Sequence, residues 1–217
     1  MEDEKMSPRV YGIFYTFVVS AIFVAMLAFL NAATRNRIIE NEEIRLQTSI
    51  LIAVGVLHPD DLPQRDMISS IFSESIRTIQ YSEGNIYLSE NNQEKVIAFL
   101  VSSPGLWGTI TAVVAINESY DRLAGIEFYE HSETPGLGGR IDELDFKNQF
   151  KGLLISEDPE ARISVVRFEE DVSKERSSIA AITGATRTSE SIQELINRAI
   201  NSVLPVIAEV LGDNNGG

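Results

Sequence analysis

The chain has 217 residues, 44% of them hydrophobic, which is enough for one globular domain and an additional segment. Its formal charge of −14, from 32 acidic and 18 basic residues, repels nucleic acid and argues against partners bound through a phosphate backbone. The sequence has no cysteine, which excludes disulfides, thiolate metal sites and cysteine-held iron–sulfur clusters. Any electron carrier in this protein is therefore organic or held by other ligands.

An uncharged apolar run near the N-terminus predicts one membrane span. Residues 10–30 carry no charged side chain, and their number is close to the ~20 that cross a bilayer as a helix. A cleaved signal peptide has a shorter apolar region of roughly 7–15 residues, so we expect a retained transmembrane helix over 10–33, preceded by a tail, 1–9. Basic residues flank both ends of the run, so the charge pattern does not decide the orientation.

The segment after the span mixes isoleucine and leucine with glutamate at helical spacing, which predicts a helical stalk over 34–57. The following HPDDLP, residues 58–63, is typical of a turn. A lone histidine beside two aspartates is much more often turn chemistry than a metal site, so we assign no metal. Residues 58–211 are expected to form the folded domain and 212–217 a flexible tail.

The folded domain is predicted to be α/β (α+β), with a mainly antiparallel sheet flanked by helices. Short runs rich in β-branched and aromatic residues predict strands at 85–89, 95–103, 109–116, 123–131 and 161–168, and a short helix is expected over 142–153. The strongest pattern is an apolar helical face running to Val210. We expect this last helix to begin at Thr188 or Ser189 and to kink or end near Pro205.

Two glycine-containing motifs offer candidate ligand contacts. In PGLWGTI, residues 104–110, glycines bracket Trp107; taken alone, this favours an aromatic side chain wedged into the core over a flat wall for a planar ring. In HSETPGLGGR, residues 131–140, Glu133, Thr134 and the backbone amides offer hydrogen bonds to a heteroaromatic edge. An ordinary long turn is the alternative there, and the GLGG spacing does not match the dinucleotide-binding fingerprint.

A third motif, ITGATRTS at residues 182–189, places hydroxyl groups at the start of the last helix. Gly184 and Ala185 leave the backbone accessible, and Thr186 is expected just ahead of the helix. A helix N-terminus offers free N–H donors to a phosphate, and Arg187 can add a counter-charge. From this motif alone, simple helix capping with spare threonines is at least as good an interpretation.

In combination, these motifs resemble the FMN-binding G subunit of the Rnf-type ion-translocating electron-transport complex, a family related to the C subunit of the sodium-pumping NADH:quinone oxidoreductase. The resemblance covers nearly the whole chain: the apolar span, GLWGTI, HSETPGLGGRI, FKNQFKG at 146–152 and ITGATRTS. It implies that FMN is held covalently by a phosphoester to Thr186, attached by a flavin transferase. The other implied flavin-lining residues are Trp107, Glu133, Thr134, Leu137, Thr183, Gly184, Ala185 and Arg187.

The resemblance also implies a membrane-anchored subunit that relays electrons and catalyses no turnover alone. Its partners would be the other membrane subunits, with ferredoxin and NAD reached only through the complex, and the output would be sodium or proton translocation. The soluble domain would lie on the extracytoplasmic side of the cell (inner) membrane. The length, without large insertions, favours the Rnf type over the quinone-reductase type. The rival hypothesis is a flavin-free anchored scaffold, supported by Ala180, which stands where the family motif often has aspartate.

Overall fold

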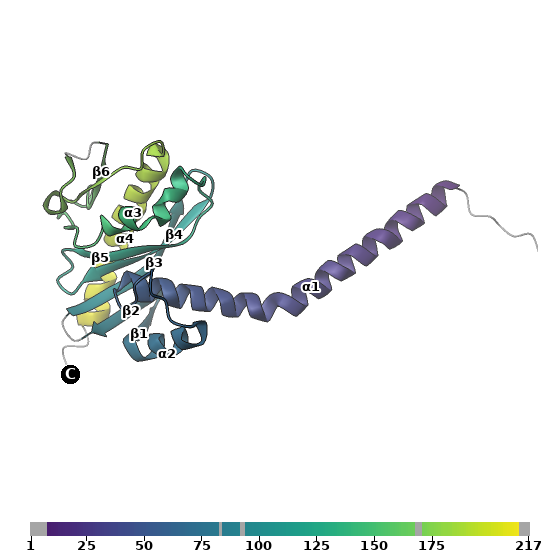
Figure 1. Ribbon diagram of the computed structural model, residues 1–217, viewed down its shortest axis with the longest axis horizontal. Helices are drawn as coiled ribbons and strands as arrows, with labels where there is room; N and C mark the ends of the chain where they lie inside the picture. Colours follow the sequence, from purple (N-terminus) through teal and green to yellow (C-terminus); the bar gives the residue numbers. More distant parts are fainter. Residues whose placement is uncertain (1–7, 83, 92–93, 168–170, 213–217) are drawn as a thin grey trace, which may run out of the picture. The chain divides into compact units, whose positions relative to one another are not determined.

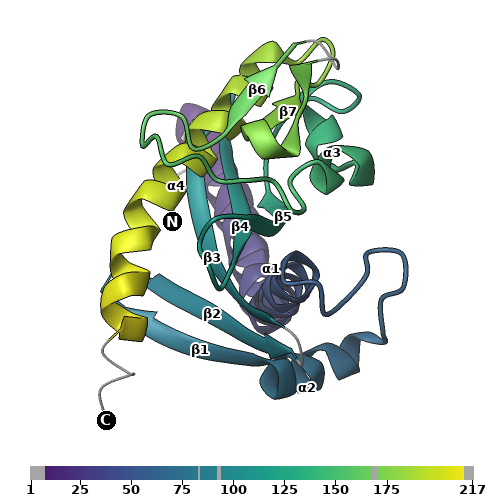
Figure 2. The ribbon, with the colours of Figure 1, turned by 90° about the vertical axis from the view of Figure 1, so that its left-hand side faces the viewer.

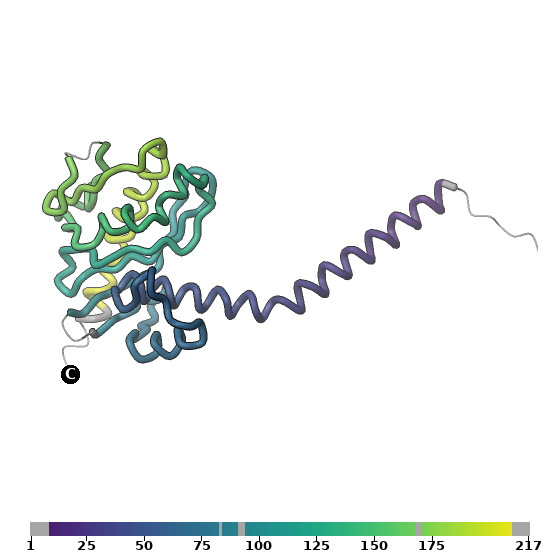
Figure 3. Tube along the Cα trace, viewed as in Figure 1, coloured from purple at the N-terminus to yellow at the C-terminus, as the bar shows by residue number. Residues whose placement is uncertain are grey.

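The computed structural model describes residues 8–82, 84–91, 94–167 and 171–212, and Figure 3 traces their course. Two units are distinguished, residues 1–43 and 44–217. The described part of the first unit is the N-terminal part of one helix, α1 (Pro8–Ala53), drawn in purple in Figure 1. The segment Arg9–Ala53 is long and apolar enough to cross a membrane, and none of its most apolar window is buried. The predicted span therefore lies within a helix that offers its apolar side chains to the surroundings.

The C-terminal end of α1 belongs to the second unit, where Ile50 and Leu51 are buried. The helix ends in a Schellman motif: the Val56 N–H donates to the Leu51 carbonyl at 2.9 Å. Gly55 has a φ of +80°, a left-handed conformation that glycine adopts without steric cost. The sequence therefore both buries the end of this helix and stops it at Gly55.

A five-stranded antiparallel sheet forms the centre of the second unit. Its strands follow one another in chain order, as Figure 2 shows. They are β1 (Ile76–Tyr81), β2 (Gly84–Asn91), β3 (Glu94–Pro104), β4 (Thr109–Asn117) and β5 (Leu123–Glu130). The prediction of a mainly antiparallel sheet flanked by helices is confirmed, and four of the predicted strands correspond to β2–β5. Neither β1 nor the helix before it, α2 (Arg65–Ser75), was predicted.

Both faces of the sheet are covered. The last helix, α4 (Thr186–Gly212), packs on one face with Ala112, Val114 and Ile116 of β4, while Val113 and Ala115 point to the opposite face, toward α2 and the end of α1. Figure 2 shows α4, in yellow, along its side of the sheet. Because β4 is buried on both faces, its sequence is a continuous apolar run instead of an alternating one.

The remaining elements are short and lie between β5 and α4. They are the 3₁₀ helix η1 (Gly138–Asp142), α3 (Leu144–Asn148), β6 (Ser164–Val166), the 3₁₀ helix η3 (Lys174–Arg176) and β7 (Ser178–Ala180), and β6 pairs with β7 in parallel. The predicted helix at 142–153 and strand at 161–168 are thus shorter than expected, and β7 was not predicted.

The predicted start of the last helix, Thr188 or Ser189, is wrong by two or three residues. α4 begins at Thr186, because the Ser189 N–H donates to the Ala185 carbonyl at 3.0 Å and so makes Ala185 the N-cap. The helix also continues through Pro205 to Gly212 instead of ending near the proline. Val203 and Ile207, on either side of Pro205, are buried, so packing against the sheet holds the helix together where propensity would end it.

Candidate functional site

The three sequence motifs meet at one end of the sheet. β3 ends at Pro104 opposite the first residue of β4, Thr109, and β5 ends nearby at Glu130, opposite Thr111. The hairpin loop 105–108 and the segment that follows β5 therefore leave the sheet at the same edge. The start of α4 contacts the segment after β5 through Thr188, and that segment contacts the hairpin loop through Glu133.

The hairpin loop presents apolar side chains to solvent. The Gly105 N–H donates to the Gly108 carbonyl at 2.7 Å, which closes the loop. Trp107 is 68% exposed and Leu106 52% exposed. The interpretation of Trp107 as a core residue is therefore wrong, because its side chain is exposed on the closed loop. An exposed indole on an ordered loop is a surface suited to a planar ligand.

A buried carboxylate, Glu133, connects the three motifs. The side chain is 5% exposed, although it follows β5 in a loop. Its Oε1 accepts hydrogen bonds from the backbone N–H groups of Leu106, at 2.8 Å, and Trp107, at 3.2 Å. Its Oε2 accepts one from the Thr188 hydroxyl of α4 at 2.6 Å. Three donors from two other segments thus compensate the burial of this carboxylate.

Two glycines make room for this carboxylate. A Cβ at Gly105 would lie 2.6 Å from Glu133 Oε1. A Cβ at Gly138 would lie 2.6 Å from Glu133 Oε2 and 2.5 Å from Thr188 Oγ1. The close approach of the Glu133 side chain therefore leaves no room for a Cβ at Gly105 or Gly138.

The segment after β5 is held in place by His131. The Glu133 N–H donates to His131 Nδ1 at 3.1 Å, so Nδ1 carries no proton and Nε2–H donates to Asp142 at 2.9 Å. Thr134 is exposed, and its carbonyl accepts the Gly139 N–H at 2.9 Å. Leu137 is exposed too, and one of its methyl carbons would lie 3.3 Å from a Cβ at Gly184. The loop therefore adds a third exposed apolar side chain, Leu137, which lies beside Gly184 of the third motif.

The third motif forms a tight turn into α4. The Ala185 N–H donates to the Ile182 carbonyl at 3.0 Å, and Gly184 has a φ of +81°. Thr183, Thr186 and Arg187 are exposed, whereas Ala185 is buried. The guanidinium of Arg187 lies 3.6 Å from Glu190 on the helix surface.

Two of the hydroxyl groups in this motif are used within the fold. The buried Thr188 donates to Glu133, and the buried Ser189 donates to the Ala185 carbonyl and accepts the Ile182 N–H. The expectation that Thr188 or Ser189 caps the helix is therefore wrong. The exposed hydroxyl groups at the turn are those of Thr183 and Thr186, and Thr186 is the first residue of α4.

These features fit FMN. Leu106, Trp107 and Leu137 are exposed on the two loops that contain or contact the buried Glu133, and apolar side chains of this kind are suited to contact with an isoalloxazine ring. The first N–H groups of an α-helix have no intrahelical acceptor, so the first turn of the 27-residue α4 offers donors and a positive dipole end to a phosphate. The Thr186 hydroxyl lies at that turn.

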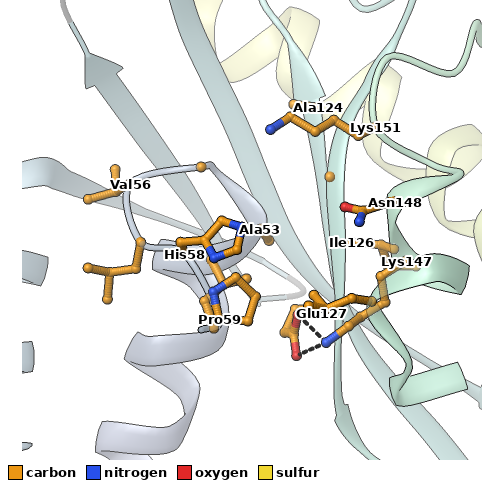
Figure 4. Close-up of a pocket in the computed structure, with 15 residues that line it drawn as sticks. Ala53, Val56, His58, Pro59, Ala124, Ile126, Glu127, Lys147, Asn148 and Lys151 are labelled. Atoms are coloured by element: carbon orange, nitrogen blue, oxygen red, sulfur yellow. Dashed lines mark hydrogen bonds and ion pairs between the residues drawn. The ribbon is translucent and has the colours of Figure 1, made fainter. Parts of the chain in front are cut away.

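A separate cavity of about 250 Å³ lies between the end of α1, β5 and α3 (Figure 4). Glu127 and Lys147 form an ion pair in its wall, with the Lys147 Nζ 2.9 Å and 3.0 Å from the two carboxylate oxygens. Both side chains are largely buried. This cavity shares no lining residue with the site around Glu133, and in the described part of the chain no group of histidine, aspartate and glutamate is arranged to hold a metal ion.

The region that contains the three motifs matches a known protein family. Residues 105–201 match the family of FMN-binding domains. The chain is 35% identical over 112 residues to the C subunit of the Na⁺-translocating NADH-quinone reductase of Vibrio vulnificus, covering 51% of this chain and 44% of that protein. It is 29% identical over 142 residues to the corresponding protein of Pseudomonas aeruginosa, covering 64% of this chain and 52% of that protein. The chain thus spans about half the length of these relatives.

Solved structures show the same fold. The crystal structure of the C subunit of the Na⁺-translocating NADH-quinone reductase from Parabacteroides distasonis superimposes with a TM-score of 0.66 at 18% identity, covering 78% of this chain and 94% of that one. Shewanella oneidensis NqrC superimposes with a TM-score of 0.55 at 18% identity, covering 71% and 91%. Residues 105–201 thus match FMN-binding domains, and the chain is similar in sequence and in fold to the C subunits of Na⁺-translocating NADH-quinone reductases.

Proposed function

We propose that this protein is a membrane-anchored electron-relay subunit that carries FMN covalently through a phosphoester to Thr186. The observation that carries the proposal is the position of the Thr186 hydroxyl, exposed at the first turn of α4 within an FMN-binding domain. Thr188 and Ser189 are buried and engaged in hydrogen bonds, which leaves Thr183 as the competing hydroxyl. Thr183 precedes the helix by a further turn, where the N–H donors of α4 do not converge on a phosphate.

Five of the other proposed site residues have distinct tasks. Trp107 and Leu137 provide the apolar surface against the ring, and the exposed Thr134 is available to its polar edge. Gly184 keeps the turn open, and Arg187 offers a positive charge near the phosphate. When bound, FMN supplies the redox chemistry that the side chains of this cysteine-free chain do not.

A covalent attachment fits the charge of this chain. Its formal charge of −14 disfavours retention of a dianionic phosphate by electrostatics alone. A tether removes dissociation and holds the ring at high effective concentration. A flavin transferase is the proposed partner in maturation.

At the level of the whole protein, we propose a subunit of an ion-translocating ferredoxin:NAD oxidoreductase of the Rnf type. The long apolar α1 and the homology to membrane-associated subunits support a membrane anchor. The proposal places the anchor in the cell (inner) membrane, the folded domain on the extracytoplasmic side, and the other membrane subunits as direct partners. Ferredoxin and NAD would be reached only through them. The equivalent subunit of a sodium-pumping quinone reductase is the second candidate, favoured by the homology to those C subunits.

The protein isolated from its own cells tests both levels of the proposal. FMN should remain with the chain after denaturation, and Trp107 emission should be quenched relative to the flavin-free protein. Co-purified subunits should then reduce NAD with ferredoxin as donor. Quinone-linked NADH oxidation would favour the second candidate instead, and a colourless chain from cells with an active flavin transferase would favour a flavin-free scaffold.

A further inference from the structure

Glu133 joins all three motifs, yet its carboxylate is buried and both oxygens are already engaged. Oε1 accepts the Leu106 and Trp107 N–H groups, and Oε2 accepts the Thr188 hydroxyl. The side chain is only 5% exposed, and these hydrogen bonds are all made within the protein. Its use therefore differs from that of an exposed flavin-lining residue such as Thr134.

We infer that Glu133 is a positioning residue, which fixes the Trp107 loop to the first turn of α4 so that the ring surface and the attachment point form one preorganised unit. Thr188 is the second member of this link. The inference rests on the proposed function for its purpose, although the link itself is present in the chain without a ligand.

The residues around Glu133 leave its carboxylate little freedom to move, so the geometry of the link is fixed. Gly105 and Gly138 approach the carboxylate so closely that a Cβ at either position would overlap with one of its oxygens. The backbone N–H of Glu133 is itself held by His131 Nδ1. The position of Glu133 is thus determined from the hairpin loop, the β5 segment and α4 together.

Hydrogen bonds to a charged acceptor are stronger than neutral ones, so the link restrains the loop more than two amide–amide bonds would. Removing the carboxylate frees the Leu106 and Trp107 N–H groups and leaves no other acceptor for them in this link. The exposed indole then loses its fixed orientation relative to Thr186. A flavin attached at Thr186 would then no longer find the Trp107 indole in position for stacking.

Trp107 is the chain's only tryptophan, so its emission reports on this loop alone. The experiment uses the full-length chain in detergent, produced without a flavin transferase, with Glu133→Leu, Glu133→Gln, Thr188→Val and the exposed β5 residue Glu130→Gln as control. Leucine fills the space without accepting hydrogen bonds, whereas the glutamine carbonyl still accepts the two amides. We expect lower indole anisotropy and about tenfold faster exchange of the Leu106 and Trp107 amides in Glu133→Leu. Glu133→Gln, whose neutral carbonyl is a weaker acceptor, should show a smaller change in the same direction, and Glu130→Gln should behave like wild type.

Thr188→Val is expected to change anisotropy and exchange in the same direction, by less, and it carries the test if Glu133→Leu does not fold. With the transferase present, Glu133→Leu should lose most of its covalent FMN and Glu133→Gln should retain it. Wild-type anisotropy and amide exchange in Glu133→Leu, or in Thr188→Val if only that variant folds, would overturn the positioning role. A wild-type chain that carries no FMN when the transferase is present would overturn the proposed function. The anisotropy and exchange measurements on the flavin-free chain would still test the positioning role of Glu133.

Discussion

At the scale of single residues, the Glu127–Lys147 pair predicts a pH dependence. Burial raises the pKa of Glu127 above its ordinary value, and the hydrogen bond and charge of Lys147 oppose part of that rise. Because the folded-state pKa exceeds the unfolded one, the folded protein binds the proton more tightly. This group's contribution to the free energy of unfolding is therefore fully present below the ordinary pKa and is lost as pH rises through the raised one.

Glu127→Gln should remove this contribution to the free energy of unfolding. The free energy of unfolding of the wild type minus that of the variant, measured with urea, should therefore fall as pH rises through this window. Glu143 provides a control of opposite sign, because the hydrogen bond from Arg140 lowers its pKa. Glu143→Gln should lose stability relative to wild type above the ordinary carboxyl pKa. Identical pH profiles for wild type and Glu127→Gln would show that burial of Glu127 has no energetic effect.

A second residue-scale prediction concerns the same pair. Lys147→Met leaves Glu127 buried without its partner and should lower the free energy of unfolding at neutral pH by about 3 kcal/mol. The double variant Glu127→Leu/Lys147→Met should recover most of that loss, because it buries no unpaired charge. A double variant no more stable than Lys147→Met alone would contradict this account.

Some properties of the site residues could be predicted from the sequence, and others could not. The exposed hydroxyl of Thr186 was predictable, since it lies beside a Gly-Ala step at the start of a strong helical pattern. The exposure of Trp107 was not, because glycine-flanked tryptophans are also common under turns. The Glu133–Thr188 hydrogen bond joins residues 55 positions apart, and no local spacing signals it. Gly105 and Gly138 are the sequence feature that reflects this contact, because both lie against the Glu133 carboxylate.

At the scale of elements, the loop from 131 to 140 offers a matched pair of substitutions. Gly138→Ala would bring a Cβ into Glu133 and Thr188, whereas a Cβ at Gly136 meets no atom within 4 Å but requires a φ of +75°. Gly136→Ala should therefore cost about 1 kcal/mol through backbone strain and leave Trp107 emission unchanged. Gly138→Ala should cost about 1–3 kcal/mol and alter the emission of Trp107. Thermal unfolding with tryptophan fluorescence separates the two, and unchanged emission in Gly138→Ala would contradict the described packing.

Elements with strong apolar content were predictable, and weakly patterned ones were not. β4 is long and buried, β3 is long with a buried centre, and α4 repeats its apolar residues through many turns. By contrast, α2 buries only Ile68, and the edge strand β1 is mostly exposed, so neither carries a clear periodic signal. β6 and β7 have three residues each and are defined by pairing with each other, which is a tertiary property.

At the scale of the whole molecule, the orientation of the anchor follows from the proposed function. The chain has no cysteine, so one introduced at the exposed Ser82, in the turn after β1, is a unique label site. In intact cells, an impermeant thiol reagent should label Ser82→Cys from outside and should reach Ser7→Cys, on the other side of the span, only after the membrane is opened. The reverse pattern would place the folded domain in the cytoplasm.

The central claim is that Thr186 carries FMN. The most direct measurement is peptide mass mapping of the full-length chain co-expressed with a competent flavin transferase, for wild type, Thr186→Val and the matched control Thr183→Val. We predict the mass of an FMN phosphoester on the Thr186 peptide of wild type and Thr183→Val, and its complete absence in a folded Thr186→Val protein. Covalent FMN on Thr186→Val, or an unmodified wild type beside a demonstrably active transferase, would contradict the account.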